Sequence, residues 1–212
     1  MYLKDDMAPY YAIAFNLTQE EEDDMTFFNA YNYADAIYSQ RFEGLPQVVN
    51  WTDDQIYMIN TTQIYALLNP FTDYARKLFV SKQLERAMYE ITDIMTQPIF
   101  ARNGSIPFYR VMSSHDTQVS NIMKQVNPGF NFTYIPYASS VYFEVYSHDG
   151  DFFVQTVFNG EPHIVGDCGV KMCPQEIWTN WMSNVLVMDN DALLHADCNE
   201  QPTEVEIWPK FQ

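Results

Sequence analysis

The sequence predicts an α/β fold, in which a helical lobe precedes a partial mixed sheet flanked by helices. Apolar side chains recur at helical spacing in three segments of the first half, near 20–39, 52–69 and 81–95. An apolar run at 106–112 comes directly before another helical pattern at 117–126, which is typical of a strand followed by a helix. Alternating stretches on both sides of Asp149-Gly150 predict a β-hairpin. We therefore expect a helical lobe over residues 1–97 and an α/β part over residues 98–212.

Two capping boxes mark the expected helix starts in the lobe. Thr18-Gln19-Glu20-Glu21 and Thr52-Asp53-Asp54-Gln55 each place a threonine three residues before Glu or Gln, and the paired side chains satisfy free amides of the first turn. We expect the first helix to reach about Ser39 and the second to stop before Pro70. Three tyrosines of the first helix could line a substrate cleft or pack against another helix, namely Tyr31, Tyr33 and Tyr38.

The third helix of the lobe is expected over about 81–95. One face of this segment is apolar, through Leu84, Met88, Ile91 and Met95. Pro98 ends the pattern. Residues 1–17 are apolar and aromatic but show no clear period, so no element is predicted there.

The α/β part contains three expected strands and two expected helices. The hairpin strands are Val141–Tyr146 and Asp151–Phe158, and Glu144 falls on the exposed face of the first. A last helix is expected over Pro174–Met188, with apolar residues on its inner face: Ile177, Trp178, Trp181 and Val185.

The balance of charge limits the classes of partner. The chain has 28 acidic and 11 basic residues and a net charge of -17, so no basic surface is expected for nucleic acid. No run of eighteen apolar residues predicts a transmembrane helix. The first residues do not resemble a signal peptide, and we expect any such signal to lie upstream. Five Asn-x-Ser/Thr glycosylation motifs together favour a secreted protein or one of the lysosomal or vacuolar lumen, at Asn16, Asn50, Asn60, Asn103 and Asn131.

The three cysteines fall in the last third of the chain. Cys168 and Cys173 are close enough in sequence to form a disulfide, which leaves Cys198 to find another partner. A zinc site made by these three cysteines and His195 is the alternative. A secreted protein favours the disulfide.

A His-Asp pair, within Ser114-His115-Asp116-Thr117, lies where the expected strand meets the next helix. Free amides at a helix N-terminus carry partial positive charge and favour an anion such as phosphate. His115 could add a hydrogen-bond donor and Asp116 a proton. In the alternative interpretation, Ser114 or Asp116 is only the N-cap of the helix and the histidine is buried nearby.

This motif resembles part of a known family. Ser114-His115-Asp116-Thr117 followed by Pro136–Tyr146 (PYASSVYFEVY) is similar to the C-terminal half of the histidine acid phosphatases, branch 2 of the histidine phosphatase superfamily. The resemblance extends from about Leu45 to Cys198. It implies that His115 binds phosphate, that Asp116 protonates the leaving alcohol, and that a small phosphate monoester is hydrolysed without a metal ion or other cofactor. It further implies that the helical lobe covers the phosphate pocket.

The family's nucleophile is missing from this sequence. That nucleophile is a histidine in an Arg-His-Gly-x-Arg-x-x-Pro motif on the central strand, and here no histidine follows an arginine. We therefore expect a fragment-like chain that is inactive alone. An upstream segment or a second chain would complete the sheet and pair Cys198, and without it we expect poor solubility or association. The alternative function is that of a non-catalytic relic that acts as a binding or interaction module.

Overall fold

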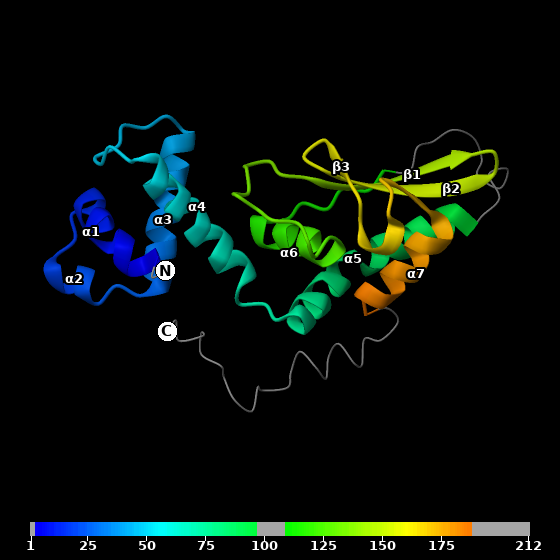
Figure 1. Cartoon of the computed structure of the whole chain (residues 1–212), viewed down its shortest axis with the longest axis horizontal. Helices are drawn as coiled ribbons and strands as arrows, with labels where there is room; N and C mark the ends of the chain where they lie inside the picture. The colour runs from blue at the N-terminus through cyan, green and yellow to red at the C-terminus, as the bar shows by residue number, and fades with distance from the viewer. Residues whose placement is uncertain (1–2, 97–108, 188–212) are drawn as a thin grey trace, which may run out of the picture. The chain divides into compact units, whose positions relative to one another are not determined.

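The structure is a computed structural model that describes residues 3–96 and 109–187, and it divides into two compact units. The first unit runs to Pro70 and includes Asn131–Ile135, and the second contains Phe71–Phe130 and the residues after Ile135 up to Val187. Together the described residues form an α/β structure of seven helices and a small four-stranded open sheet. Figure 1 shows the course of the chain through these elements. The boundary after Pro70 assigns the third predicted helix to the second unit.

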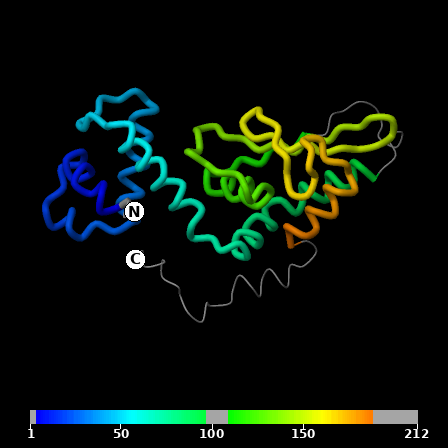
Figure 2. The backbone as a smooth tube through the Cα atoms, viewed as in Figure 1, coloured from blue at the N-terminus to red at the C-terminus, as the bar shows by residue number. Residues whose placement is uncertain are grey.

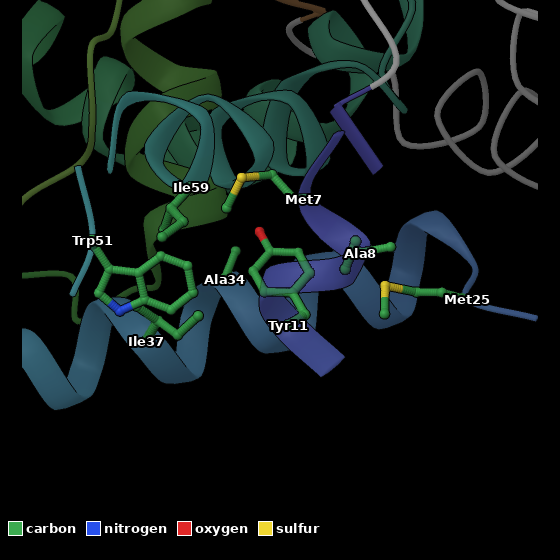
Figure 3. Packing of buried hydrophobic residues seen from close by; sticks show 9 residues of the cluster. Met7, Ala8, Tyr11, Met25, Ala34, Ile37, Trp51 and Ile59 are labelled. Atoms are coloured by element: carbon green, nitrogen blue, oxygen red, sulfur yellow. The ribbon is translucent and has the colours of Figure 1, made fainter. Parts of the chain in front are cut away.

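The first unit is built from helices that pack around one apolar core. These helices are α1 (Leu3–Phe15), α2 (Gln19–Asp23), α3 (Phe27–Phe42) and α4 (Asp53–Leu68). Side chains from α1, α3 and α4 meet Trp51 in the core, as Figure 3 shows for Tyr11, Ala34 and Ile59. Burial of these apolar side chains is the main source of stability for a unit of this kind.

The prediction of one helix over 20–39 is wrong, because the chain breaks between α2 and α3. A capping box that the sequence analysis missed starts α3, in which the Thr26 amide donates to the Asn29 Oδ1 at 2.9 Å. Asparagine replaces the usual Glu or Gln of this motif. The two predicted boxes, at Thr18 and Thr52, are both present.

Helix α1 was not predicted, although its buried side chains do follow a helical period. Met7, Ala8 and Tyr11 are buried, and the spacing of these positions matches one face of a helix. Pro9, which normally disfavours a helix interior, masks this pattern. The Tyr11 side chain is buried, and burial raises the pKa of this phenol.

The second unit combines the sheet with the remaining helices. Its elements are α5 (Asp73–Thr96), α6 (Asp116–Val126), β1 (Val141–His148), β2 (Asp151–Phe158), β3 (Glu161–His163), the short 3-10 turn η2 (Gly166–Cys168), β4 (Met172–Pro174) and α7 (Gln175–Val185). Helix α5 begins eight residues before the predicted 81, and its four predicted core residues are all buried. Helix α7 lies within the predicted range, but Ile177 is exposed and Met182 takes the buried position instead.

The predicted hairpin is confirmed, with β1 paired antiparallel to β2. Tyr142 lies opposite Val157 and His148 lies opposite Asp151. On the other side of β2, β3 pairs with Thr156–Phe158 and β4 with Phe153–Gln155, so the chain returns to β2 twice (Figure 2). Every pairing among these described strands is antiparallel, so the predicted mixed sheet is not found in this part of the chain.

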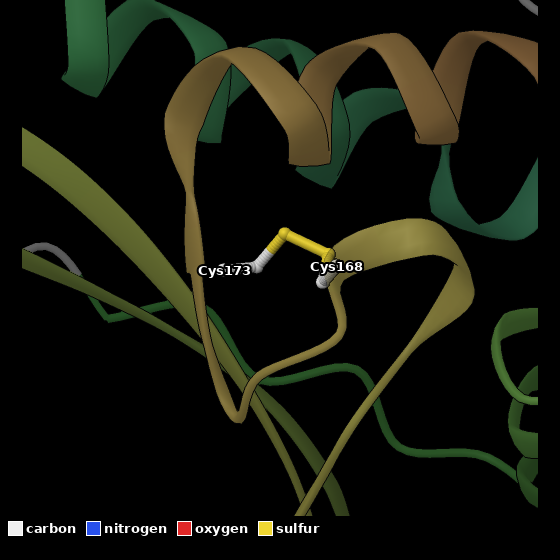
Figure 4. The surroundings of a disulfide bond; sticks show 2 residues. All are labelled: Cys168 and Cys173. Carbon is white, nitrogen blue, oxygen red and sulfur yellow. A yellow bond between two sulfur atoms is a disulfide. The ribbon is translucent and has the colours of Figure 1, made fainter.

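Helix α7 packs on one face of the sheet. Trp178 is buried, and its ring meets Phe143 of β1 edge-on at a centroid distance of 6.5 Å. The predicted disulfide joins Cys168 of η2 to Cys173 of β4, as Figure 4 shows, and both cysteines are buried. Within the described ranges, no helix is both long enough and apolar enough to cross a bilayer.

Candidate functional site

The His-Asp pair lies at the start of helix α6. His115 is the N-cap with extended backbone angles, and Asp116 is the first helical residue. The helix start is therefore where the sequence predicts it. Neither Ser114 nor Asp116 is the N-cap, and His115 is exposed, so the alternative with a buried histidine does not describe this helix.

The segment before the pair differs from the prediction. Residues 109–112 of the expected buried strand are irregular, and the described apolar side chains are exposed, with Tyr109 72% and Val111 70% accessible. The remaining residues of that expected strand, 106–108, lie outside the described ranges. A buried strand needs neighbours on both sides, and among the described strands none pairs with this segment.

Local hydrogen bonds shape the first turn of α6. The His115 amide donates to the Gln118 Oε1 at 3.2 Å, and the Thr117 amide donates to the Asp116 Oδ1 at 2.7 Å. The Ser114 hydroxyl accepts a hydrogen bond from the Gln83 side chain of α5 at 2.9 Å. These contacts fix the backbone around the pair, while the side chains of His115 and Asp116 are both exposed.

A buried hydrogen-bond network, which was not predicted from the sequence, supports this helix start. The Arg76 Nε donates to the Asn121 Oδ1 at 3.1 Å, and the Asn121 Nδ2 donates to the Thr117 carbonyl at 2.8 Å. Arg76 and Asn121 are both buried, so their hydrogen bonds hold α6 on α5. The helix predicted from 81 did not include Arg76, and a polar residue on a helix gives no signal of burial by its spacing.

The arginines near this site are engaged by carboxylates. Arg110 forms an ion pair with Glu90, whose pKa is lowered mainly by the hydrogen bond from Arg110. Arg76 forms an ion pair with Asp73 at 2.9 Å. Any anion at the N-terminus of α6 would therefore rely on His115 and the helix amides, unless one of these ion pairs opens.

Glu144, which was expected on a solvated face, is half-buried. The Tyr146 hydroxyl donates to the Glu144 Oε2 at 2.7 Å, and this bond raises the pKa of Tyr146. Both side chains lie on the face of β1 opposite Phe143, because side chains alternate along a strand. Because the Tyr146 hydroxyl donates to this carboxylate, Glu144 has a structural role on the surface of β1.

The predicted cysteine and glycosylation sites are distributed over both units. Cys198 and His195 lie outside the described residues, as does Asn103. Residues 3–96 and 109–187 contain no group of three or more metal-ligating side chains. Asn16, Asn50 and Asn131 are exposed, whereas Asn60 is half-buried in α4.

A shallow pocket in the first unit was not predicted. Its volume is about 250 Å³, and it is lined by Tyr38, Arg41, Phe42, Ile56, Asn60 and Tyr134. Tyr38 therefore lines a pocket, whereas Tyr33 packs in the core against Phe15 at a centroid distance of 4.7 Å. The pocket is formed by residues that are far apart in the sequence. The only sequence signal for it was the group of tyrosines in the helix predicted near 20–39.

No family model matches the sequence, and no match was found among curated proteins.

Proposed function

We propose that Ser114-His115-Asp116-Thr117 forms one half of a site that hydrolyses phosphate monoesters. In this proposal His115 holds the phosphate and Asp116 gives a proton to the departing alcohol. The single observation that supports it is the placement of both exposed side chains, side by side in sequence, at the first residues of an eleven-residue helix. The helix dipole favours an anion at this position, while the His115 and Thr117 amides already donate to the side chains of Gln118 and Asp116.

The proposed chemistry needs a nucleophile that the sequence does not supply in the expected motif. A histidine would attack the phosphorus in line and form a phosphohistidine, while the bond to the alcohol breaks. Asp116 would protonate the alkoxide and then accept a proton from the water that cleaves the phosphohistidine. Because a carboxylic acid donates only while protonated, this role favours acidic conditions. We therefore expect the 212-residue chain to bind phosphate but not to turn over a substrate.

The alternative is a non-catalytic module that uses the same surface to bind a partner. The absence of the Arg-His-Gly motif from the sequence favours this alternative. The two functions share the anion-binding histidine, and they differ in whether Asp116 has a chemical role.

Phosphate binding tests the proposal directly. Inorganic phosphate is titrated into the whole chain and followed by ³¹P NMR or calorimetry. We expect His115→Ala to weaken binding about tenfold, because a charge-assisted hydrogen bond of about 1.5 kcal/mol is lost. Asp116→Asn removes a negative charge beside the anion, so it should keep or strengthen binding.

His148→Ala serves as the matched control, because this histidine is exposed in the β1–β2 hairpin, away from α6. Phosphate affinity that is unchanged in His115→Ala, or equally weakened in His148→Ala, would contradict the proposed role of His115. Hydrolysis of p-nitrophenyl phosphate by the unmodified chain, lost in Asp116→Asn, would show that the chain supplies its own nucleophile and would rule out the purely binding module.

A further inference from the structure

We propose that Asn60 carries an N-linked glycan whose first N-acetylglucosamine occupies the shallow pocket of the first unit. The inference does not rest on the phosphatase proposal. It joins two independent observations, the glycosylation motif Asn60-Thr61-Thr62 and the presence of Asn60 among the residues that line the pocket. Asn-x-Thr is the acceptor motif for glycosylation in the secretory route.

The aromatic rings of the pocket provide the surface for a sugar. Phe42 is 64% and Tyr134 is 45% exposed, and Tyr38 is half-buried beside them. Exposed aromatic residues that gather in one place mark a site of contact rather than ordinary surface. The C–H groups on one face of a sugar ring pack on aromatic rings, and the hydroxyl groups of the sugar remain in contact with water.

The size of the pocket fits one sugar ring. Its volume of about 250 Å³ lies below the range of roughly 300–1,000 Å³ that is usual for drug-sized ligands. The proposal places one saccharide in this volume, and the rest of the glycan would extend into solvent. Arg41, which also lines the pocket, supplies hydrogen-bond donors for the acetamido oxygen or a hydroxyl.

In the folded unit, the Asn60 side chain can carry a sugar without giving up a hydrogen bond. Among the described residues, no hydrogen bond engages this side chain, and it is half-buried rather than buried. The exposed Asn16 and Asn50 also carry the motif, but neither lines the pocket. Glycans at Asn16 and Asn50 therefore serve as internal references for a glycan that does not contact the aromatic residues of the pocket.

The modification has to precede the folding of α4. Thr62 is buried, and its hydroxyl donates to the Met58 carbonyl at 2.9 Å, so a transferase cannot read the motif in the folded helix. On the extended chain, the donor is an oligosaccharide linked to a lipid diphosphate. A bond forms between the Asn60 Nδ2 and the anomeric carbon, the bond from that carbon to the diphosphate oxygen breaks, the diphosphate leaves with the electron pair, and the amide proton is lost.

The test uses the full chain, produced through the secretory route of a eukaryotic cell. Mass spectrometry of the peptide that contains Asn60 measures occupancy. An endoglycosidase then trims every glycan to one N-acetylglucosamine. We expect an upfield ring-current shift of the acetyl methyl proton signal at Asn60 relative to the same signal at Asn50.

Thermal unfolding of the trimmed protein gives a second readout. We expect the form with one sugar at Asn60 to melt about 2–4 °C above Asn60→Gln. Phe42→Ala, at an exposed position, should abolish this difference and the ring-current shift, whereas Asn50→Gln should leave both unchanged. The proposal fails if Asn60 is unmodified in chains that carry glycans elsewhere. It also fails if the sugar at Asn60 shows no ring-current shift and, in addition, Phe42→Ala leaves the difference in melting temperature unaltered.

Discussion

Gly166 has to be glycine because of the indole packed against it. The residue begins η2 with a φ of +49°, and a Cβ built there would lie 1.9 Å from the Trp181 Nε1. Trp181 is itself buried, so it cannot move aside without opening the core. We expect Gly166→Ala to lower the free energy of unfolding by about 3 kcal/mol or more, from steric overlap and left-handed backbone strain together. Urea unfolding followed by tryptophan fluorescence measures the loss.

Gly169 provides the control for this prediction. Its φ is +67°, but a Cβ there would have no heavy atom within 4 Å. Gly169→Ala therefore carries only the backbone strain, about 1 kcal/mol. Equal losses in the two variants would show that the contact with Trp181 does not determine the choice of glycine at 166.

His163 makes stability depend on pH. Its ring meets the Phe130 ring edge-on at 5.1 Å, and burial, with a smaller contribution from Lys171, lowers its pKa from 6.5, while Glu161 partly offsets the shift. Because the imidazole binds a proton more weakly in the folded than in the unfolded chain, the unfolded state takes up protons first as the pH falls. The contribution of the neutral His163 ring to the free energy of unfolding is fully present above pH 6.5 and declines as the pH falls below that value.

The expected outcome is a smaller loss of stability between pH 6.5 and pH 5 in His163→Gln than in the unmodified chain. Unfolding by urea at a series of pH values measures this slope. His148→Gln, at the exposed last residue of β1, serves as the control for the loss of an imidazole outside the core. An unaltered slope in His163→Gln would assign the pH dependence to the carboxylates instead.

At the scale of elements, signals confined to a few neighbouring residues were predicted well. The capping boxes at Thr18 and Thr52, the turn at Asp149-Gly150 and the start of α6 each depend on contacts within four residues or so. The break before α3 was missed because asparagine at position 29 is an uncommon member of a capping box. Local chemistry was therefore sufficient where the residues were the usual ones.

Features that depend on distant residues were not predicted. The strand expected at 106–112 was inferred from apolar residues alone, but a strand forms only with a paired neighbour, and residues 109–112 have none among the described strands. In the same way, the Arg76–Asn121 hydrogen bond and the pocket around Asn60 join residues from separate elements. Spacing along the chain contains no information about such pairs. The position of His115 and Asp116 at a helix start was predicted because it is a local feature.

The disulfide links two short elements that have little regular structure of their own. Cys168 and Cys173 are five positions apart in the sequence, so the bond closes a small loop. The bond lowers the conformational entropy of the unfolded chain, which stabilises the folded state by about 2 kcal/mol. We expect the double variant Cys168→Ala with Cys173→Ala to lose about this amount in urea unfolding, and to lose the sensitivity of the melting temperature to a strong reductant. An unmodified chain that melts at the same temperature with and without reductant would show that the bond is absent or without effect on stability.

For the molecule as a whole, net charge and exposed apolar surface act in opposite directions. A charge of -17 keeps copies of the chain apart, and this repulsion is weakened by salt. Exposed Tyr109 and Val111 lie in an irregular segment, on alternate positions, while Arg110 between them is bound to Glu90. An exposed apolar segment without a paired strand invites association with another chain.

We therefore expect the chain to associate at micromolar concentration in about 0.5 M salt, because an ionic strength of this order screens the repulsion between copies. Val111→Lys should weaken association about tenfold, through the loss of about 1.5 kcal/mol of apolar burial. Sedimentation velocity at several concentrations measures the effect. Val48→Lys is the matched control, because Val48 is also exposed, at 76%, and the substitution changes the net charge equally. If both variants weaken association alike, charge determines the association and the apolar segment at 109–112 does not. An unmodified chain that remains monomeric in high salt would show that this segment is not a site of association.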